Sequence, residues 1–401
     1  MIKRRTLTVV VTVCAAGLSA ASVASASAVS SASDSNSTST SGSGSASVPA
    51  TASASASASA SVPGTDLNAG ANSWTTAVGD NGDVTGAHSV SGQIHGFVWH
   101  GGTLVDLPPG ANQDYSIANA VDAGGDVVGT GGNYGLGYVH AYEWKGGSPN
   151  GTDFGALYGN SFGNAVNTGG EIAGQSQTSL SVTVGALLNS GVPTVLPDLG
   201  GSYTAPMYLN DAGTAAGYSL TPSGDQHAVV WIGGKLTDLG IGTAAGLNAQ
   251  GQVLVASAQG KGTPFLWTNG VETTFGAGVQ TVTGLNNAGQ VVGTFLPAGS
   301  TTAHGFVWQN GQLTDLGAAF FPTAVNNVGQ VLGNTAADSY GLGVVWYQGQ
   351  VTTLAPTSGQ YSEPEQLNDN GLVAGIVQGT QDATVWQLPA VSGAALQKRG
   401  G

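Results

Sequence analysis

Hydrophobic and polar positions follow a unit that recurs eight times between about residues 64 and 390. The unit begins with an aliphatic residue, followed in most copies by Asn, two variable residues, Gly, one further residue, two mostly apolar residues and Gly, as in residues 285–293. Successive units are 38 to 45 residues apart, about 41 on average. A period of this length predicts one repeat architecture. The first glycines of the eight copies are Gly82, Gly125, Gly170, Gly213, Gly251, Gly289, Gly329 and Gly371.

The second half of the unit carries a tryptophan and then a tight turn, as in residues 304–317. Asn310-Gly311 and Gly101-Gly102 are residue pairs that accept positive φ, as the two-residue turn of a β-hairpin requires. A segment similar to Leu-Thr-Asp-Leu follows the turn and predicts another strand. Seven of the eight tryptophans occupy the same repeat position, namely Trp99, Trp144, Trp231, Trp267, Trp308, Trp346 and Trp386, whereas Leu188 fills it in the third copy and Trp74 lies elsewhere.

Each unit is interpreted as four short strands without a helix. Residues 305–308 and 228–231 are apolar on both alternating faces, so both sides of each sheet must be buried. A ring of four-stranded sheets packed face to face buries both sides of every sheet, and units of about 40 residues match this architecture. We therefore predict an all-β fold, an eight-bladed β-propeller of about 41-residue repeats, over residues 64–390.

The two ends of the repeat region are expected to share one blade. The last copy supplies its tryptophan strand and then fades at Leu388-Pro389 without a Thr-Asp-Leu strand. Thr65-Asp66-Leu67, ahead of the first complete copy, has the missing sequence. An N-terminal strand near residues 64–67 is therefore predicted to close the ring, whereas an open solenoid would carry polar capping repeats instead.

The regions outside the repeats predict export. Residues 1–26 combine a basic start, an apolar run and the small-residue site Ala24-Ser25-Ala26, which is typical of a secretory signal peptide. The only cysteine, Cys14, lies inside it, so the mature chain is expected to hold together without a disulfide. Residues 27–63 are rich in Ser and Ala and predict a disordered linker. Residues 391–401 predict a flexible tail. The protein is expected to be secreted and extracellular.

The charge balance excludes some partners. The 401 residues contain 8 Lys and Arg against 22 Asp and Glu. Three of the basic residues belong to the signal peptide, which leaves 5 against 22, a net charge of −17. Such an acidic body disfavours nucleic acid and anionic lipid as partners. No later segment reaches the 18 or more apolar residues of a membrane span, and we expect a monomer.

At these residues the chain resembles the bacterial extracellular HAF-repeat proteins, named for a His-Ala-Phe triplet in the unit. The triplet stands here as His95-Gly96-Phe97, His140-Ala141-Tyr142, His227-Ala228-Val229 and His304-Gly305-Phe306, while Val184, Thr263, Leu342 and Asp382 replace His in the other copies. The resemblance spans residues 64–390. It implies a secreted β-propeller-like repeat protein and no particular reaction.

Histidines and acidic turns are the first candidates for metal chemistry. The four triplet histidines belong to four different units, so packing is the favoured interpretation over a zinc site, which needs convergent ligands. Asp80, Asp83 and Asp369 lie in acidic turns that are candidates for calcium, because this hard cation prefers oxygen ligands. These turns are also ordinary repeat turns. Beyond calcium, no cofactor is expected.

Three glutamates are the candidates for catalysis. Glu143 takes a repeat position that is otherwise aliphatic, where an unpaired carboxyl would have a raised pKa, and Lys145 is its candidate partner. Glu363 and Glu365 flank Pro364 and suggest a carboxylate pair of the glycosidase kind, although two exposed acids in a loop are usually only solvated. Aromatic residues in loops are candidates for stacking on sugars: Tyr115, Tyr134, Tyr158, Phe162, Tyr203, Phe320, Phe321, Tyr340 and Tyr361.

The conspicuous repeated residues are thus explained by turns and interblade packing. The predicted function is a secreted binding or interaction module for an extracellular glycan or protein, which would meet the variable loops at one end of the ring. The alternatives are an extracellular hydrolase or lyase on the same scaffold, and a purely structural envelope protein.

Overall fold

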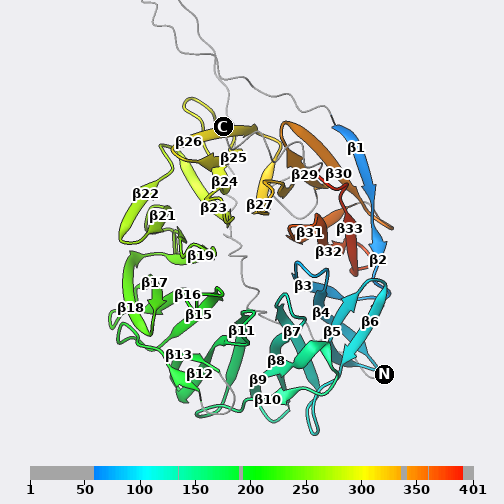
Figure 1. The fold of residues 1–401 in the computed structure, drawn as a ribbon, viewed down its shortest axis with the longest axis vertical. Coiled ribbons are helices and arrows are strands. Elements are labelled where there is room, and N and C mark those ends of the chain that lie inside the picture. The colour runs from blue at the N-terminus through cyan, green and yellow to red at the C-terminus, as the bar shows by residue number, and fades with distance from the viewer. Residues whose placement is uncertain (1–57, 134, 189–192, 336–340, 360, 392–401) are drawn as a thin grey trace, which may run out of the picture.

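The computed structural model describes residues 58–133, 135–188, 193–335, 341–359 and 361–391. Within these residues the chain forms 33 strands and one short 3-10 turn, η1 (Lys145–Gly147). The strands build a ring of eight blades around a central channel (Figure 1). The predicted all-β, eight-bladed propeller is confirmed. No helix among the described residues is long and apolar enough to cross a membrane.

The blades follow one another along the chain, each with its innermost strand first. Blades 1 to 4 are β3 (Trp74–Val78), β4 (Val84–Val90), β5 (Gln93–His100) and β6 (Thr103–Leu107); β7 (Tyr115–Val121), β8 (Val127–Asn133), β9 (Tyr138–Trp144) and β10 (Thr152–Asp153); β11 (Ser161–Val166), β12 (Ile172–Ser179), β13 (Val182–Leu187) and β14 (Thr194–Val195); β15 (Thr204–Leu209), β16 (Ala215–Leu220), β17 (Gln226–Ile232) and β18 (Lys235–Ile241).

Blades 5 to 8 continue the ring. They are β19 (Thr243–Leu247), β20 (Val253–Ala256), β21 (Phe265–Thr268) and β22 (Val271–Thr274); β23 (Val279–Leu285), β24 (Val291–Phe295), β25 (His304–Gln309) and β26 (Gln312–Gly317); β27 (Phe321–Val325), β28 (Val331–Asn334), β29 (Gly343–Tyr347) and β30 (Gln350–Ala355), with β1 (Ala58–Pro63) outside β30; and β31 (Ser362–Leu367), β32 (Leu372–Val377), β33 (Asp382–Gln387) and β2 (Thr65–Asp66).

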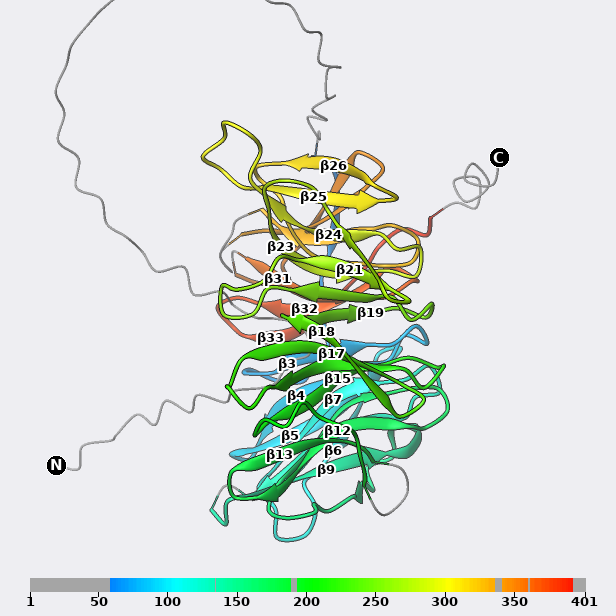
Figure 2. The ribbon, with the colours of Figure 1, turned by 90° about the vertical axis from the view of Figure 1, so that its left-hand side faces the viewer.

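Antiparallel pairing within each blade gives the ring two different faces. The connections between first and second strands and between third and fourth strands emerge on one face, which we call the turn face. The remaining connections emerge on the opposite loop face, and Figure 2 shows the ring edge-on between the two. Turn-face hairpins are tight, with Asn269 and Asn310 at φ of 48° and 50° before a glycine, as the Asn-Gly pairs predict.

The N-terminal strand closes the ring as predicted. β2 pairs antiparallel with β33, with Thr65 opposite Val385 and Asp66 opposite Thr384, and so supplies the fourth strand of blade 8. The predicted linker boundary at residue 63 is too late, because β1 pairs in parallel with β30 on the outside of blade 7. Val62 of β1 is buried beside Leu354 and anchors this Ser/Ala-rich strand to the core.

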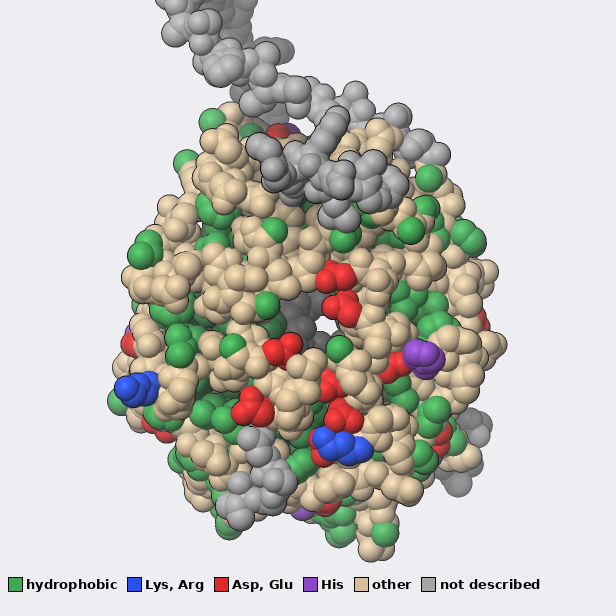
Figure 3. Space-filling model, viewed as in Figure 1, with side chains coloured by type: hydrophobic (Ala, Val, Ile, Leu, Met, Phe, Trp, Pro, Cys, Tyr) green, Lys and Arg blue, Asp and Glu red, His purple; other side chains and the backbone are tan. Residues whose placement is uncertain are grey.

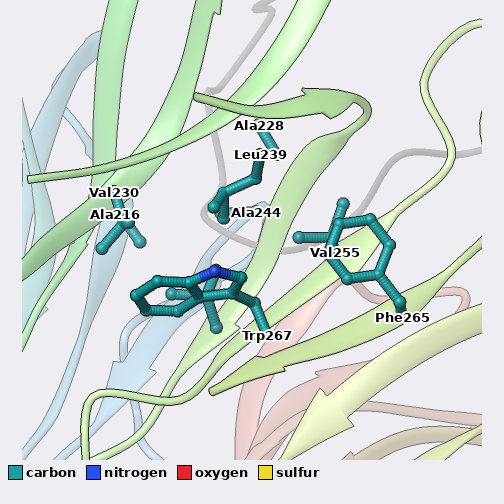
Figure 4. Packing of buried hydrophobic residues seen from close by; sticks show 9 residues of the cluster. Ala216, Ala228, Val230, Leu239, Ala244, Val255, Phe265 and Trp267 are labelled. Carbon is teal, nitrogen blue, oxygen red and sulfur yellow. The ribbon is translucent and has the colours of Figure 1, made fainter. Parts of the chain in front are cut away.

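The repeated tryptophans pack between blades, as the sequence indicates. Trp267 of blade 5 lies against Ala216 and Val230 of blade 4 (Figure 4). In the same way, Trp308 of blade 6 belongs to a buried cluster that includes Leu266 of blade 5. Each tryptophan therefore faces the preceding blade, and its indole removes apolar area from water at one seam of the ring.

Every innermost strand carries a β-bulge at one repeat position. The register against the second strand skips one residue there, for example between Thr75 and Ala77 in β3 and between Pro364 and Gln366 in β31. A bulge re-aims the extra side chain relative to its neighbours. The eight bulged residues are Thr76, Asn119, Asn164, Met207, Ala245, Thr283, Thr323 and Glu365.

Candidate binding site at the mouth of the central channel

A belt of asparagine side chains surrounds the channel on the turn face. The Asn of the repeat motif donates a hydrogen bond from Nδ2 to the backbone carbonyl oxygen of the same repeat position in the next blade. Asn286 does so to Asn326 over 2.8 Å, and Asn248 to Asn286 over 3.0 Å. The six donors of this amide belt are Asn167, Asn210, Asn248, Asn286, Asn326 and Asn368.

The same asparagines also hold their own turns. The Oδ1 atom of Asn286 accepts the backbone N–H groups of Ala288 and Gln290 at 3.0 and 2.9 Å. A side chain that accepts within its turn and donates across the seam needs both an amide oxygen and an amide nitrogen, which explains the recurrent Asn. The side chain is buried, so each of these bonds satisfies a polar group that would otherwise lie away from water.

The amide belt is interrupted at blades 1 and 2. Gly79 takes the Asn position in blade 1 and has no side chain, and Asp122 takes it in blade 2. Asp122 Oδ1 still accepts the N–H groups of Gly124 and Asp126, at 2.8 and 2.9 Å. An ionised carboxylate has no hydrogen to donate across the seam, so the two seams that these residues face lack the belt bond.

The belt borders a cavity of about 380 Å³ at the mouth of the channel. Its wall is a ring of aliphatic side chains at the residue before the Asn position: Val78, Val121, Val166, Leu209, Leu247, Leu285, Val325 and Leu367. Its rim includes four carboxyl groups, on Asp80, Asp122, Asp211 and Asp369, and no Lys, Arg or His lines it among the described residues. Figure 3 shows acidic side chains gathered around the central opening on this face.

Three of the rim carboxylates bind neighbouring blades through one or both oxygens. Asp80 Oδ1 accepts the backbone N–H of Asp369 at 3.0 Å, and Asp211 Oδ1 accepts that of Thr168 at 2.9 Å. Asp369 accepts the backbone and side-chain amides of Asn327 at 2.7 and 2.6 Å. Among the described residues, the Oδ2 atoms of Asp80 and Asp211 make no such bond. Each of these two carboxylates therefore keeps one hydrogen-bond acceptor at the rim.

The calcium candidates do not come together as one set. Asp80 and Asp369 meet at the channel mouth, whereas Asp83 accepts a hydrogen bond from Asn81 at 2.7 Å and contacts His100 Nδ1 at 2.6 Å. Within the part of the chain that the structure describes, no three His, Cys, Asp or Glu side chains are placed to hold a metal ion.

The triplet histidines lie in separate blades, each paired with an aspartate of its own blade. His227 Nδ1 lies 2.9 Å from Asp238, and His304 Nδ1 lies 2.9 Å from Asp315. The aspartate is the Asp of the Thr-Asp-Leu strand. The sequence held a signal for this pair, because copies in which Val184, Thr263 or Leu342 replaces His have Val or Thr in place of the Asp. The histidines thus fasten the third strand to the fourth.

Glu143 forms the ion pair that the sequence suggested. Its Oε1 atom lies 2.7 Å from Lys145 Nζ, and the same Nζ lies 2.8 Å from Asp126 Oδ2. Hydrogen bonds to Asp126 and then Glu143 raise the pKa of the Lys145 ammonium. Glu143 is buried and Lys145 is exposed, so the pair neutralises an acid in the outer part of blade 2 and lies outside the channel-mouth cavity.

Glu363 and Glu365 lie on the innermost strand of blade 8 rather than in an exposed loop. Glu363 accepts a hydrogen bond from Gln378 Nε2 at 2.5 Å. Glu365 Oε2 accepts one from Thr75 Oγ1 of blade 1 at 3.1 Å. Burial, together with the charge of Glu363, raises the pKa of the Glu365 carboxyl to about 7. Neither glutamate lines the channel-mouth cavity.

The loop aromatics are dispersed over the loop face. Tyr158 is half exposed, whereas Tyr115 and Phe320 are buried. Tyr134 and Tyr340 lie outside the described residues. Phe162, Tyr203, Phe321 and Tyr361 are partly buried. Tyr203 stacks on Tyr218 with ring centroids 5.8 Å apart, so one face of its ring is already occupied.

Comparisons with known proteins give structural similarity only. No family model matches the chain, and no curated protein matches its sequence. A puromycin-hydrolysing peptidase of Mycobacterium tuberculosis is 12% identical, with 80% of this chain and 61% of that chain covered and a TM-score of 0.48. This chain thus spans about three fifths of that peptidase.

Two other solved structures are matched over nearly their whole length. The β-propeller domain of the trilobed protease from Pyrococcus furiosus is 6% identical, with 80% of this chain and 96% of that chain covered and a TM-score of 0.46. A catalytically inactive virginiamycin B lyase from Staphylococcus aureus with quinupristin is 12% identical, with 81% and 98% covered and a TM-score of 0.40.

Proposed function

We propose that this chain is a secreted binding module of the HAF-repeat kind, and that it holds an extracellular glycan or protein at the mouth of its central channel. The observation that carries the proposal is the cavity itself. It combines an aliphatic ring with carboxylate and amide groups on one concave surface. Binding sites are typically concave and combine apolar walls with a few polar groups that fix orientation.

The chemistry of the rim narrows the ligand class. Carboxylate oxygens of Asp80 and Asp211 accept hydrogen bonds from hydroxyl or ammonium groups, and the aliphatic ring suits the C–H face of a sugar or an aliphatic side chain. The negative rim repels phosphate, sulfate and uronate groups. A neutral or amine-bearing glycan, or a basic segment of a protein, is therefore the ligand that this mouth favours over an acidic polymer.

The test is binding of the mature chain to arrayed neutral, amine-bearing and acidic polysaccharides, with basic and acidic peptides alongside. Asp80→Asn combined with Asp211→Asn keeps an oxygen acceptor for each neighbouring N–H but removes the charge, and should weaken retention at least tenfold. Asp225→Asn is the matched control, because Asp225 pairs with Lys261 on the loop face. Equal retention of acidic polymers, or an equal effect of the control, would refute the proposal.

The competing proposal is an extracellular hydrolase or lyase. One observation favours it, namely that the pKa of Glu365 is raised to about 7 beside Glu363, which suits a general acid near neutral pH. The same polysaccharide and peptide panel separates the two proposals if released fragments are recorded with retention. Turnover that is lost in Glu365→Gln favours the enzyme, and retention without fragments favours the binding module. A panel with neither result favours the structural envelope protein.

A further inference from the structure

The bulged residues of the innermost strands join the blades by hydrogen bonds across the seams. Asn119 Nδ2 donates to the carbonyl oxygen of Gly163 at 2.9 Å, and Asn164 Nδ2 donates to that of Pro206 at 2.8 Å. In the same way, the hydroxyl groups of Thr76 and Thr283 donate hydrogen bonds to the backbone carbonyl oxygens of Ala118 and Pro322 in the next blade. At these four seams the bulged side chain is a hydrogen-bond donor.

Glu365 occupies the bulge position at the seam between blades 8 and 1, which we call the closing seam. An ionised carboxylate can only accept hydrogen bonds. Thr75 Oγ1 lies 3.1 Å from Glu365 Oε2 and 3.2 Å from Gln366 Oε1, and one hydroxyl hydrogen serves only one of these acceptors. A protonated Glu365 supplies the missing hydrogen, as the bulged amides and hydroxyls do at other seams.

The surroundings of Glu365 also disfavour its ionised form. Partial burial at the seam removes water from the Glu365 carboxyl, and Glu363, on the same strand, adds a negative charge. Of the strands packed on β31, the strands β3, β27, β28 and β32 carry no titratable side chain, and β29 carries only Tyr347. No cation among these strands compensates an ionised Glu365. These effects together raise its pKa to about 7, from an ordinary value of 4.5.

We propose that Glu365 makes the closing seam sensitive to pH, so that its neutral carboxyl holds blade 1 against blade 8 and its ionised form loosens the ring where the chain ends meet. The direction follows from linkage. A carboxyl that titrates at higher pH in the folded chain than in the unfolded chain stabilises the fold fully below the unfolded value. This stabilisation is lost as pH rises from about 4.5 towards 7.

A histidine on the outer side of the same seam also contacts the closing segment. His88 Nδ1 lies 3.0 Å from the carbonyl oxygen of Ala69, in the segment after β2, and His88 Nε2 lies 3.0 Å from Asp106 Oδ1. Asp106 also binds His95 Nδ1 at 2.9 Å. His88 therefore connects blade 1 to the segment that follows the closing strand.

The test is equilibrium unfolding of the mature, ligand-free chain by urea between pH 4.5 and 8.5. In the natural chain the unfolding constant should rise across this range about a hundredfold more than in Glu365→Gln, because Gln donates an amide at every pH. Glu363→Gln is the control. It removes the charge beside Glu365, so the unfolding constant should rise less and should stop rising at a lower pH. A Glu365→Gln variant with the same pH profile as the natural chain would overturn the proposal.

A measurement on the natural chain covers the case in which the variant does not fold. The carboxyl carbon resonance of Glu365 in isotope-labelled protein should still report a protonated group at pH 6 and an ionised group at pH 8. Ionisation complete at pH 5 would overturn the proposal. Because both experiments use ligand-free protein, their outcome does not depend on whether the channel mouth binds a glycan or a protein.

Discussion

Asn326 donates a hydrogen bond from Nδ2 to the backbone carbonyl oxygen of Asn368 at 2.9 Å, and in this way ties blade 7 to blade 8. The two residues are 42 positions apart and occupy the same place in consecutive repeats. Asn368 in turn donates to the carbonyl oxygen of Gly79 at 2.8 Å, across the closing seam. A local turn signal is therefore also a contact between repeats, and one residue type serves both purposes.

The first prediction separates the two roles of the belt asparagine. Asn286→Asp keeps the oxygen that accepts from Ala288 and Gln290 but loses the bonds donated to Asn326 and to Gln290 Oε1, so it should destabilise the fold by about 1–2 kcal/mol. Asn286→Ala also leaves the turn N–H groups without their acceptor and should cost about 2–4 kcal/mol. Urea denaturation of both variants measures the difference. Equal losses would mean that the turn acceptor contributes nothing, and an unchanged stability of Asn286→Asp would mean that the seam bond contributes nothing.

The second prediction is that the interrupted belt can be repaired. Asp122→Asn keeps the oxygen that accepts from Gly124 and Asp126 and adds a donor facing blade 3, so it should stabilise the fold by about 0.5–1.5 kcal/mol. Asp211→Asn is the control for charge, because it neutralises a rim carboxylate that directly follows the belt position instead of occupying it. A gain of the same size in both variants would trace the effect to relief of charge repulsion instead of a new bond.

The sequence predicts the ring of blades but not the hydrogen bonds that connect neighbouring blades. The repeat period, the tryptophan position and Thr65-Asp66-Leu67 predict eight blades and their closure, because each of these features is a local sequence pattern that can be recognised without knowing what it contacts. The amide belt needs the carbonyl of the next blade, and the bulge at Glu365 needs a register shift, neither of which a linear pattern encodes. β1 was missed because its composition is that of a linker, and only Val62 marks its burial.

The third prediction concerns the tryptophan position. Trp308 is 6% exposed and meets Phe275 edge-to-face with ring centroids 5.2 Å apart, across the seam between blades 6 and 5. Trp308→Ala should cost about 3–5 kcal/mol, because the loss of a large buried side chain leaves a cavity that the blades fill only in part. Leu188, which fills this position in blade 3, suggests Trp308→Leu as a milder change. Chemical denaturation should rank the alanine variant below the leucine variant, and the reverse order would contradict interblade packing.

The last prediction tests ring closure. A chain that begins at Asn68 lacks β1 and β2, so blade 8 loses its fourth strand and Val62 and Leu67 leave the clusters that they complete beside Leu354 and Val385. Its melting temperature should fall far below that of a chain that begins at Ser27, since an exposed strand edge and two vacated apolar positions remain. A chain that begins at Ala58 keeps both strands and should melt at the same temperature as the chain that begins at Ser27. Removal of residues 27–62 takes away β1 alone and should give an intermediate value. Scanning calorimetry of the three chains at one pH measures the order, and equal melting temperatures for the chains that begin at Ala58 and Asn68 would show that the N-terminal strands do not hold the ring together.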